Sequence, residues 1–303
     1  MSPWLIWTVV ALASWGIWAV LSKLLGEAIT PEQSQALSTL GLLPILLQLG
    51  LSKTASLRGV SLRGSVLALL GGIVTCLGNI AYYAALARGE KVATVVSLTA
   101  LYPLVTVLLA MSLLREKLNA MQVLGVMISV VAIWLFNVQA GKSFLAPTLI
   151  YALLPIVFWG LSGFLQKVAT NQLSAEAAAL IYLGAFVPVG LFFVLREPWP
   201  AAIGPRTWLI VVALGFFLAF GNVAVLRAFA LGGKAAVIAP LGSLYPIISV
   251  PIAVLFLQEK VSSRELMGII CAIASVAALS WERPASNTTT SNPASELERE
   301  ANH

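Results

Sequence analysis

Charged side chains are scarce in this sequence, and aspartate is absent from it. Only 10% of the 303 residues are charged, whereas 59% are hydrophobic. A soluble globular protein carries about 25% charged residues, which cover its surface toward water. The scarcity of charge therefore excludes an ordinary water-soluble domain and predicts an integral membrane protein.

Residues that usually carry out catalysis or bind metals are equally rare. The single histidine, His303, is the last residue, and the two cysteines, Cys76 and Cys271, lie within apolar segments, where we expect them to pack as small hydrophobic side chains. The sequence contains neither an H-E-x-x-H metalloprotease motif nor a Walker motif for ATP. It therefore predicts no metal, no cofactor and no enzymatic activity.

One short motif offers an enzyme as an alternative. Residues 160–163, Gly-Leu-Ser-Gly, have the G-x-S-G form of an intramembrane serine protease. Such a serine needs a base, normally a histidine on another helix, and the only histidine is terminal. The missing base argues against this alternative.

Positive charge is present but dispersed. The net charge is +6, yet the 18 lysines and arginines occur one to three at a time between apolar segments. This pattern excludes a nucleic-acid-binding face and is typical of the short loops that orient a membrane protein. The loop with Lys53, Arg58 and Arg63 favours both termini in the cytoplasm. We expect the protein in the plasma (inner) membrane of a bacterium, as a monomer or homodimer.

Ten apolar segments are long enough to span a bilayer, which takes about 20 residues per helix. The alternation of a membrane β-barrel is absent, so we predict an all-α integral membrane fold with ten transmembrane helices. The polar tail 282–303 is expected to be disordered. The predicted helices cover residues 4–24, 34–51, 65–87, 92–114, 119–138, 147–168, 175–195, 207–231, 235–257 and 264–281.

The sequence contains an internal repeat. Residues 101–118, LYPLVTVLLAMSLLREKL, match residues 244–261, LYPIISVPIAVLFLQEKV, at eight positions with an offset of 143. Further pairs follow the same register or one shifted by a single residue, among them Gly78-Asn79 with Gly221-Asn222 and Trp15-Gly16 with Trp159-Gly160. Residues 4–138 and 147–281 are therefore two copies of one five-helix unit.

An odd number of helices per unit determines how the copies are oriented. Five spans carry the chain across the membrane, so the second copy enters from the opposite side and is inverted relative to the first. Many secondary transporters have this architecture and bind solute between the repeats, near the middle of the bilayer. Two inverted five-helix repeats therefore predict a central site that opens alternately to the two sides. A receptor or scaffold is the alternative, but it gives no reason for the duplication.

These motifs resemble the EamA family of the drug/metabolite transporter superfamily. The similarity lies in the W-G-x-x-x-x-x-x-K segments (residues 15–23 and 159–167), the two L-Y-P segments that end in Glu-Lys, and the Gly-containing segments that follow them. It covers residues 4–281. The resemblance implies a ten-helix transporter, often an exporter, of small organic solutes such as amino acids and related metabolites.

Polar and aromatic residues recur on one face of several predicted helices, with spacings such as i, i+3 and i+7. Polar side chains are costly in lipid, so we expect these faces to turn inward and line a solute pathway. Packing between helices and anchoring at the interface are the alternatives for any one of them. The candidates are Trp15, Trp18, Ser22, Asn79, Tyr82, Tyr83, Thr99, Tyr102, Trp159, Ser162, Gln166, Asn222, Arg227 and Tyr245.

Arg227 is the one charged candidate. Its guanidinium could hold an anionic group of a solute, or it could extend to the lipid headgroups. The glutamates at 32, 116, 176 and 259 lie at the ends of predicted helices. The sequence therefore argues against a proton relay through a buried carboxylate, and leaves exchange, facilitated flux or coupling through a helix-end glutamate.

Prolines occupy corresponding positions inside two predicted helices of each repeat. Proline lacks a backbone donor and clashes with the preceding turn, so it kinks a helix. The sequence predicts that these prolines act either as hinges or as static kinks. They are Pro44, Pro103, Pro188 and Pro246.

Overall fold

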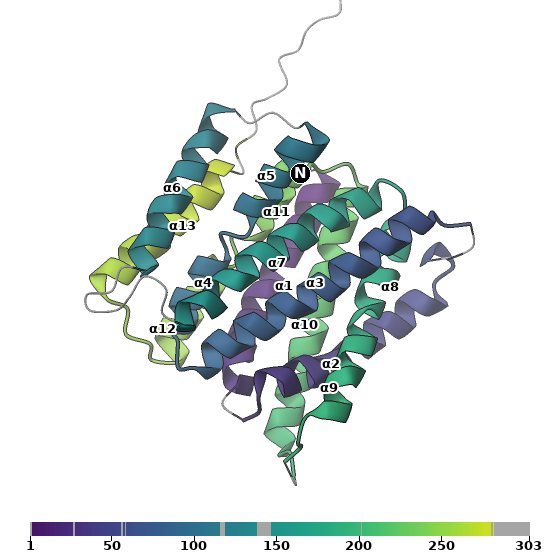
Figure 1. Ribbon diagram of the computed structural model, residues 1–303, viewed down its shortest axis with the longest axis horizontal. Helices are drawn as coiled ribbons and strands as arrows, with labels where there is room; N and C mark the ends of the chain where they lie inside the picture. Colours follow the sequence, from purple (N-terminus) through teal and green to yellow (C-terminus); the bar gives the residue numbers. More distant parts are fainter. Residues whose placement is uncertain are drawn as a thin grey trace, which may run out of the picture.

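The computed structural model describes residues 2–26, 28–55, 57, 59–115, 119–137, 147–200, 202–279 and 281. Within these residues the chain folds into one bundle of helices (Figure 1). The predicted disordered tail 282–303 lies outside the described residues. The helices are α1 (Pro3–Gly26), α2 (Pro31–Leu51), η1 (Lys53–Ala55), α3 (Leu62–Ala87), α4 (Val92–Thr99), α5 (Pro103–Leu114), α6 (Ala120–Asn137), α7 (Pro147–Thr170), α8 (Ala175–Gly184), α9 (Phe186–Arg196), α10 (Pro205–Ala230), α11 (Ala235–Gly242), α12 (Pro246–Phe256) and α13 (Ser263–Leu279).

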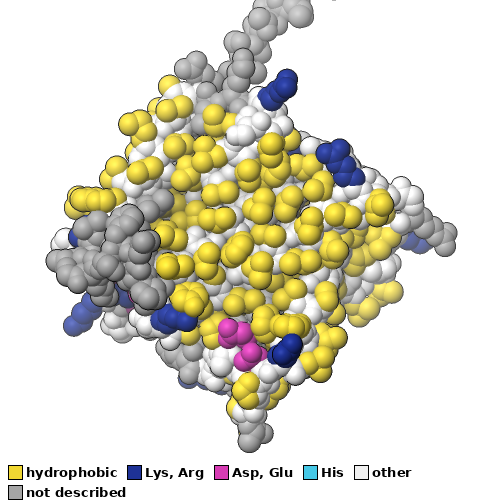
Figure 2. Space-filling model, in the orientation of Figure 1, with side chains coloured by type: hydrophobic (Ala, Val, Ile, Leu, Met, Phe, Trp, Pro, Cys, Tyr) yellow, Lys and Arg dark blue, Asp and Glu magenta, His cyan; other side chains and the backbone are white. Residues whose placement is uncertain are grey.

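The outer surface of the bundle is apolar. Large hydrophobic side chains cover the middle of the face in Figure 2, while most lysines and arginines lie toward its edges. Side chains such as Leu195 and Phe256 are 77% and 78% exposed. Water would not tolerate so much apolar surface, but lipid does. Eight segments of the described chain are long and apolar enough to cross a membrane, and the chain is a multi-pass integral membrane protein.

Two of the predicted continuous helices are broken at the same place in each repeat. Segment 92–114 consists of α4 and α5, and segment 235–257 consists of α11 and α12. Pro103 and Pro246 are the first residues of α5 and α12. Because proline has no N–H to continue the preceding helix, the residues before it tighten into i→i−3 hydrogen bonds. The Tyr102 N–H, for example, donates to the Thr99 carbonyl (3.0 Å).

The other pair of prolines does not behave alike. Pro44 lies inside the continuous helix α2. Pro188 lies in the first turn of α9, just after a break at Ala185 that separates α8 from α9. The prediction that all four prolines lie in the interior of a helix is therefore wrong for three of them, since each of the three stands at the start of a new helix.

The first helix of each half packs against the third spanning helix of the other half, so that α1 contacts α10 and α7 contacts α3. In each pair, a glycine of one helix leaves space for a tryptophan indole of the other helix. A Cβ added at Gly221 would collide with the indole of Trp15, and one added at Gly78 would collide with the indole of Trp159. The same contact, made twice with the halves exchanged, is the signature of an approximate two-fold axis.

The last helices of the halves, α6 and α13, lie side by side (Figure 1). The Asn119 side-chain amide, just before α6, donates to the carbonyl of Trp281, just after α13 (2.7 Å). At the other end the Arg264 guanidinium lies 5.4 Å from the ring centroid of Trp134. The start of α6 therefore meets the end of α13, and these two corresponding helices run antiparallel.

Contact between α2 and α10 leaves no room for a side chain at Gly215. A Cβ there would collide with the carbonyl oxygen of Ser38, and backbone cannot move aside easily. Gly215→Ala should therefore lower the free energy of unfolding by about 1–3 kcal/mol, seen as a lower melting temperature in detergent. Gly184→Ala is the matched control, because a Cβ there meets nothing within 4 Å. Equal melting temperatures for both variants would contradict this packing.

Candidate functional site

The two broken helices meet at the centre of the molecule through a reciprocal contact of two tyrosines. The Tyr102 hydroxyl donates to the carbonyl of Ala239 on α11 (3.3 Å). The Tyr245 hydroxyl donates to the carbonyl of Val96 on α4 (3.4 Å). Positions 96 and 239 correspond under the repeat offset of 143. Each half therefore supplies a hydroxyl to the backbone of the broken helix in the other half.

A third hydroxyl joins this contact on one side only. Thr99 Oγ1 lies 2.9 Å from the Tyr245 hydroxyl. The position that corresponds to Thr99 in the second half is Gly242, beside which the ring of Trp15 packs. Both tyrosines are nearly fully buried, at 6% and 2% exposed, so their hydroxyls depend on these partners.

Beside the tyrosines lies a cavity of about 60 Å³, with walls from both halves. By this measure it has room for roughly four to six water molecules. Nine of the fourteen predicted pathway residues line it: Trp15, Trp18, Asn79, Tyr102, Trp159, Ser162, Gln166, Asn222 and Tyr245.

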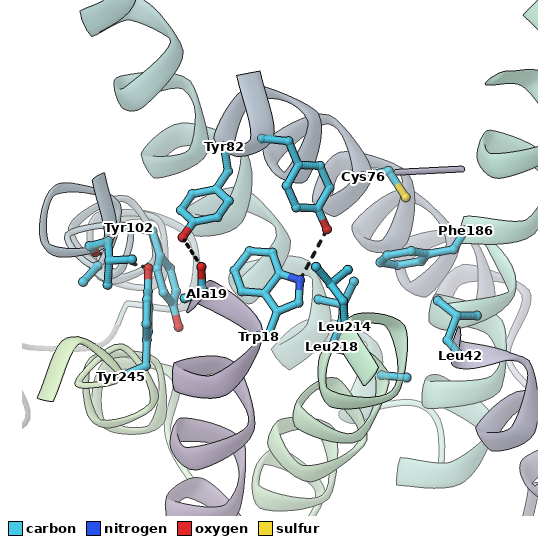
Figure 3. Close-up of a cluster of buried hydrophobic side chains, with 14 of the residues drawn as sticks. Trp18, Ala19, Leu42, Cys76, Tyr82, Tyr102, Phe186, Leu214, Leu218 and Tyr245 are labelled. Carbon is cyan, nitrogen blue, oxygen red and sulfur yellow. Dashed lines mark hydrogen bonds between the residues drawn. The ribbon is translucent and has the colours of Figure 1, made fainter. Parts of the chain in front are cut away.

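Two of the other candidates pack behind the cavity rather than lining it. Tyr82 stacks on Trp18, with ring centroids 4.9 Å apart, and its hydroxyl donates to the Ala19 carbonyl (3.2 Å; Figure 3). The Trp18 indole N–H donates to the Tyr83 hydroxyl (3.3 Å). Trp159 lies against the same rings, 5.5 Å from Tyr82. We call Trp18, Tyr82, Tyr83 and Trp159 the aromatic cluster.

The remaining three candidates do not line the cavity, and each has a partner within the protein. Thr99 bonds Tyr245 as described, and the Ser22 hydroxyl donates to the carbonyl one turn earlier in α1 (2.8 Å). The Arg227 guanidinium lies 3.3 Å from the Glu176 carboxylate and 4.7 Å from the ring centroid of Trp7. Arg227 therefore forms an ion pair at one end of the bundle, and does not contribute charge to the cavity.

Two polar residues of the cavity wall, Thr75 and Tyr182, were not predicted from the sequence. Their oxygens are 2.6 Å apart, and Thr75 is also 2.6 Å from Ser162 Oγ. Thr75 lies one helical turn before Asn79 and so on the same face of the helix. The prediction for Asn79 could therefore have been extended to Thr75. Tyr182 carried no such signal, because its counterpart in the first half is Ser38.

The cavity is displaced toward one end of the bundle, because the halves differ in side-chain size. Ser162 and Val225, which line it, correspond to Trp18 and Tyr82 of the aromatic cluster. Phe229, in the last turn of α10, also lines it. That turn lies at the end of the bundle where α1 begins, since Arg227 contacts Trp7. We call this end the terminal face, and the aromatic cluster separates the cavity from the opposite face.

On the opposite face the Glu-Lys ending of the repeat has a clear role. The Glu259 carboxylate accepts hydrogen bonds from the N–H groups of Val92 (2.7 Å) and Ala93 (3.0 Å), which open α4. A carboxylate is favourable at a helix N-terminus. Beside it, Lys91 and Glu265 form an ion pair at 2.8 Å. Every glutamate within the described residues lies in the first turn of a helix or between helices, as the sequence predicted for Glu32, Glu176 and Glu259; Glu116 lies outside the described residues.

The architecture and the cavity between the halves define a polytopic membrane protein built from two related halves around a central site. The model of the EamA-like transporter family matches residues 2–138 and 146–281. The chain belongs to this family, which confirms the resemblance.

The chain is also similar to two individual proteins. A protein from Sinorhizobium sp, described as an uncharacterized transporter in the cobO 3'region, is 32% identical over 122 residues, which cover 39% of this chain and 86% of that protein. A solved structure described only as "Crystal structure of protein" has a TM-score of 0.64 at 22% identity, and covers 90% of this chain and 94% of that chain. At this identity the structure supports the fold alone.

The contact of Thr99 with Tyr245 should be measurable as a coupling free energy. Thr99→Val and Tyr245→Phe each remove one hydroxyl and preserve the shape. A double-mutant cycle on thermal or denaturant unfolding should give a coupling of about 1 kcal/mol. The pair Thr99→Val and Tyr102→Phe is the control, because the Tyr102 hydroxyl bonds the Ala239 carbonyl and not Thr99, and it should give no favourable coupling. A Thr99–Tyr245 coupling near zero would show that the contact does not stabilise the fold.

Proposed function

We propose that the protein is a secondary transporter that moves a small organic solute across the membrane by alternating access. The observation that carries this proposal is the cavity between the halves, beside the reciprocal tyrosine contact. Eight spanning segments, together with the shorter apolar pair α6 and α13, would form ten spans in two inverted five-helix units of about 4–138 and 147–281. The antiparallel run of α6 and α13 supports that inversion.

We infer export as the direction of transport; in this conformation the cavity lies toward the terminal face. The aromatic cluster fills the space between the cavity and the opposite face, whereas smaller residues occupy the corresponding positions toward the terminal face. If the termini are cytoplasmic, as the basic loops favour, solute would enter the site from the cytoplasm. A bacterial plasma membrane is the location we propose.

The hydrogen-bond partners of Ser162 do not support the protease alternative. Its hydroxyl donates to the carbonyl of Gly71 (3.0 Å), and its other close partners are Thr75, Tyr182 and Gln166. None of these is a base that would activate a serine. The hydroxyl serves the cavity wall instead, as one member of a hydrogen-bonded chain.

Flux of solute through purified protein in liposomes tests the proposal, and filling the cavity should abolish that flux. Val225→Tyr places in the second half the residue that Tyr82 provides in the first. We expect it to reduce flux at least tenfold while the protein still inserts and folds, as judged by its melting temperature. Val212→Tyr is the matched control, because Val212 is 49% exposed on the same helix. Equal flux in both variants would exclude this cavity as the pathway.

Alternating access predicts that the two sides of the site are never open together. In a background of Cys76→Ser and Cys271→Ser, a Phe229→Cys variant should react with a membrane-impermeant maleimide from the terminal face. Tyr83→Cys should react from the opposite face. A transported solute should change the two labelling rates in opposite directions. Parallel changes in both rates would indicate a channel and contradict the mechanism.

A further inference from the structure

The side chain of Asn79 offers the cavity a hydrogen-bond donor without a partner. Asn79 is 1% exposed, and its Oδ1 accepts the indole N–H of Trp159 (3.1 Å). An indole nitrogen can only donate, so this contact fixes the orientation of the amide. The amide nitrogen, Nδ2, is then buried without a hydrogen-bond partner. A buried unpaired donor costs free energy, and a ligand can recover it.

Gln166 offers an acceptor, and a chain of hydroxyls fixes which of its atoms does so. Ser162 donates its one hydrogen to the Gly71 carbonyl, so the short contact with Thr75 requires Thr75 to donate to Ser162. Tyr182 must then donate to Thr75 and accept from Gln166 Nε2 (3.0 Å). The amide oxygen of Gln166, Oε1, faces away from this chain and has no partner.

The cavity contains no charge to match an ionised group. None of the described residues that line it is charged. The N-termini of the half-helices α5 and α12 do not substitute for a charge, because their first N–H groups are occupied. The Leu104 N–H donates to Leu101, and the Ile247 N–H donates to Leu244 (3.0 Å each). An isolated ion buried here would lose its hydration without compensation.

We infer that the site takes an uncharged solute that presents both an acceptor and a donor, such as a carboxamide, a lactam or the edge of a nucleobase, on an apolar or aromatic body. The acceptor would bond Asn79 Nδ2, the donor would bond Gln166 Oε1, and the indoles of Trp15, Trp18 and Trp159 would contact the body. A cation would also be attracted by these rings, but it cannot accept from Asn79. The inference names the substrate class of the site proposed above and rests on that proposal.

Three probes of one shape test the inference on the full-length protein in detergent. Benzamide, benzoate and benzylammonium share a ring and differ in charge. The concentration dependence of the thermal shift gives an apparent Kd for each. We expect benzamide to bind at least tenfold more tightly than either ion. Tighter binding of an ion, or no shift with benzamide, would overturn the inference. The unmodified protein gives this ranking, so the test does not depend on a variant folding.

Gln166→Met tests the acceptor directly. Methionine has a similar length but no amide oxygen, and the bonds among Tyr182, Thr75 and Ser162 can remain. Affinity for benzamide should fall about tenfold, and affinity for the two ions should not change. Gln48→Met makes the same replacement on the exposed face of α2 and is the control. Unchanged affinity for benzamide in Gln166→Met would contradict the assignment.

Flux experiments separate this inference from the proposed function. If the liposomes transport ionised solutes that also bind more tightly than benzamide, the substrate class is wrong and the transporter proposal stands. If benzamide binds as expected but no solute crosses the membrane, the binding chemistry stands and the transporter proposal is wrong.

Discussion

The crossed pair of tyrosines is the contact on which the centre of the molecule depends. A proline opens α5 and another opens α12, so in each half a helix is interrupted where the two halves meet. Interrupted backbone within a membrane is tolerated only where protein groups satisfy it. Tyr102 and Tyr245 each reach across to a carbonyl of the opposite interrupted helix. Each tyrosine hydroxyl therefore has its partner in the other half, and the cavity lies between the two halves.

Sequence differences between the two halves make the two ends of this nearly symmetric bundle unlike each other. Trp18 and Tyr82 fill one end of the central space, while the corresponding Ser162 and Val225 leave the other end open. The polar chain of Gln166, Tyr182, Thr75 and Ser162 likewise belongs to one side, because the corresponding residues are Ser22, Ser38, Leu218 and Trp18. The repeated residues thus form the helix bundle, and the residues that differ between the halves form the cavity.

The sequence predicted what duplication makes visible. The membrane class, the two-repeat organisation and the family were all readable from the apolar segments and from motifs such as the paired L-Y-P segments. The prolines marked where the helices are interrupted but not how, because an apolar run with a proline looks the same whether the helix kinks or ends there. Thr75 and Tyr182 were missed for the opposite reason, since neither is repeated. Tyr82 and Tyr83 were expected in the pathway but are large enough to pack on Trp18 instead.

The ion pair between Lys91 and Glu265 stabilises the conformation in which the opposite face is closed. The corresponding positions at the terminal face hold Lys234 and Gln122, and a neutral amide cannot form an ion pair. In a transporter that changes between two states, separating α4 from α13 at the opposite face must break this charged contact. Added salt weakens the contact by screening. Ionic strength thus becomes a means of shifting the population of the idle protein.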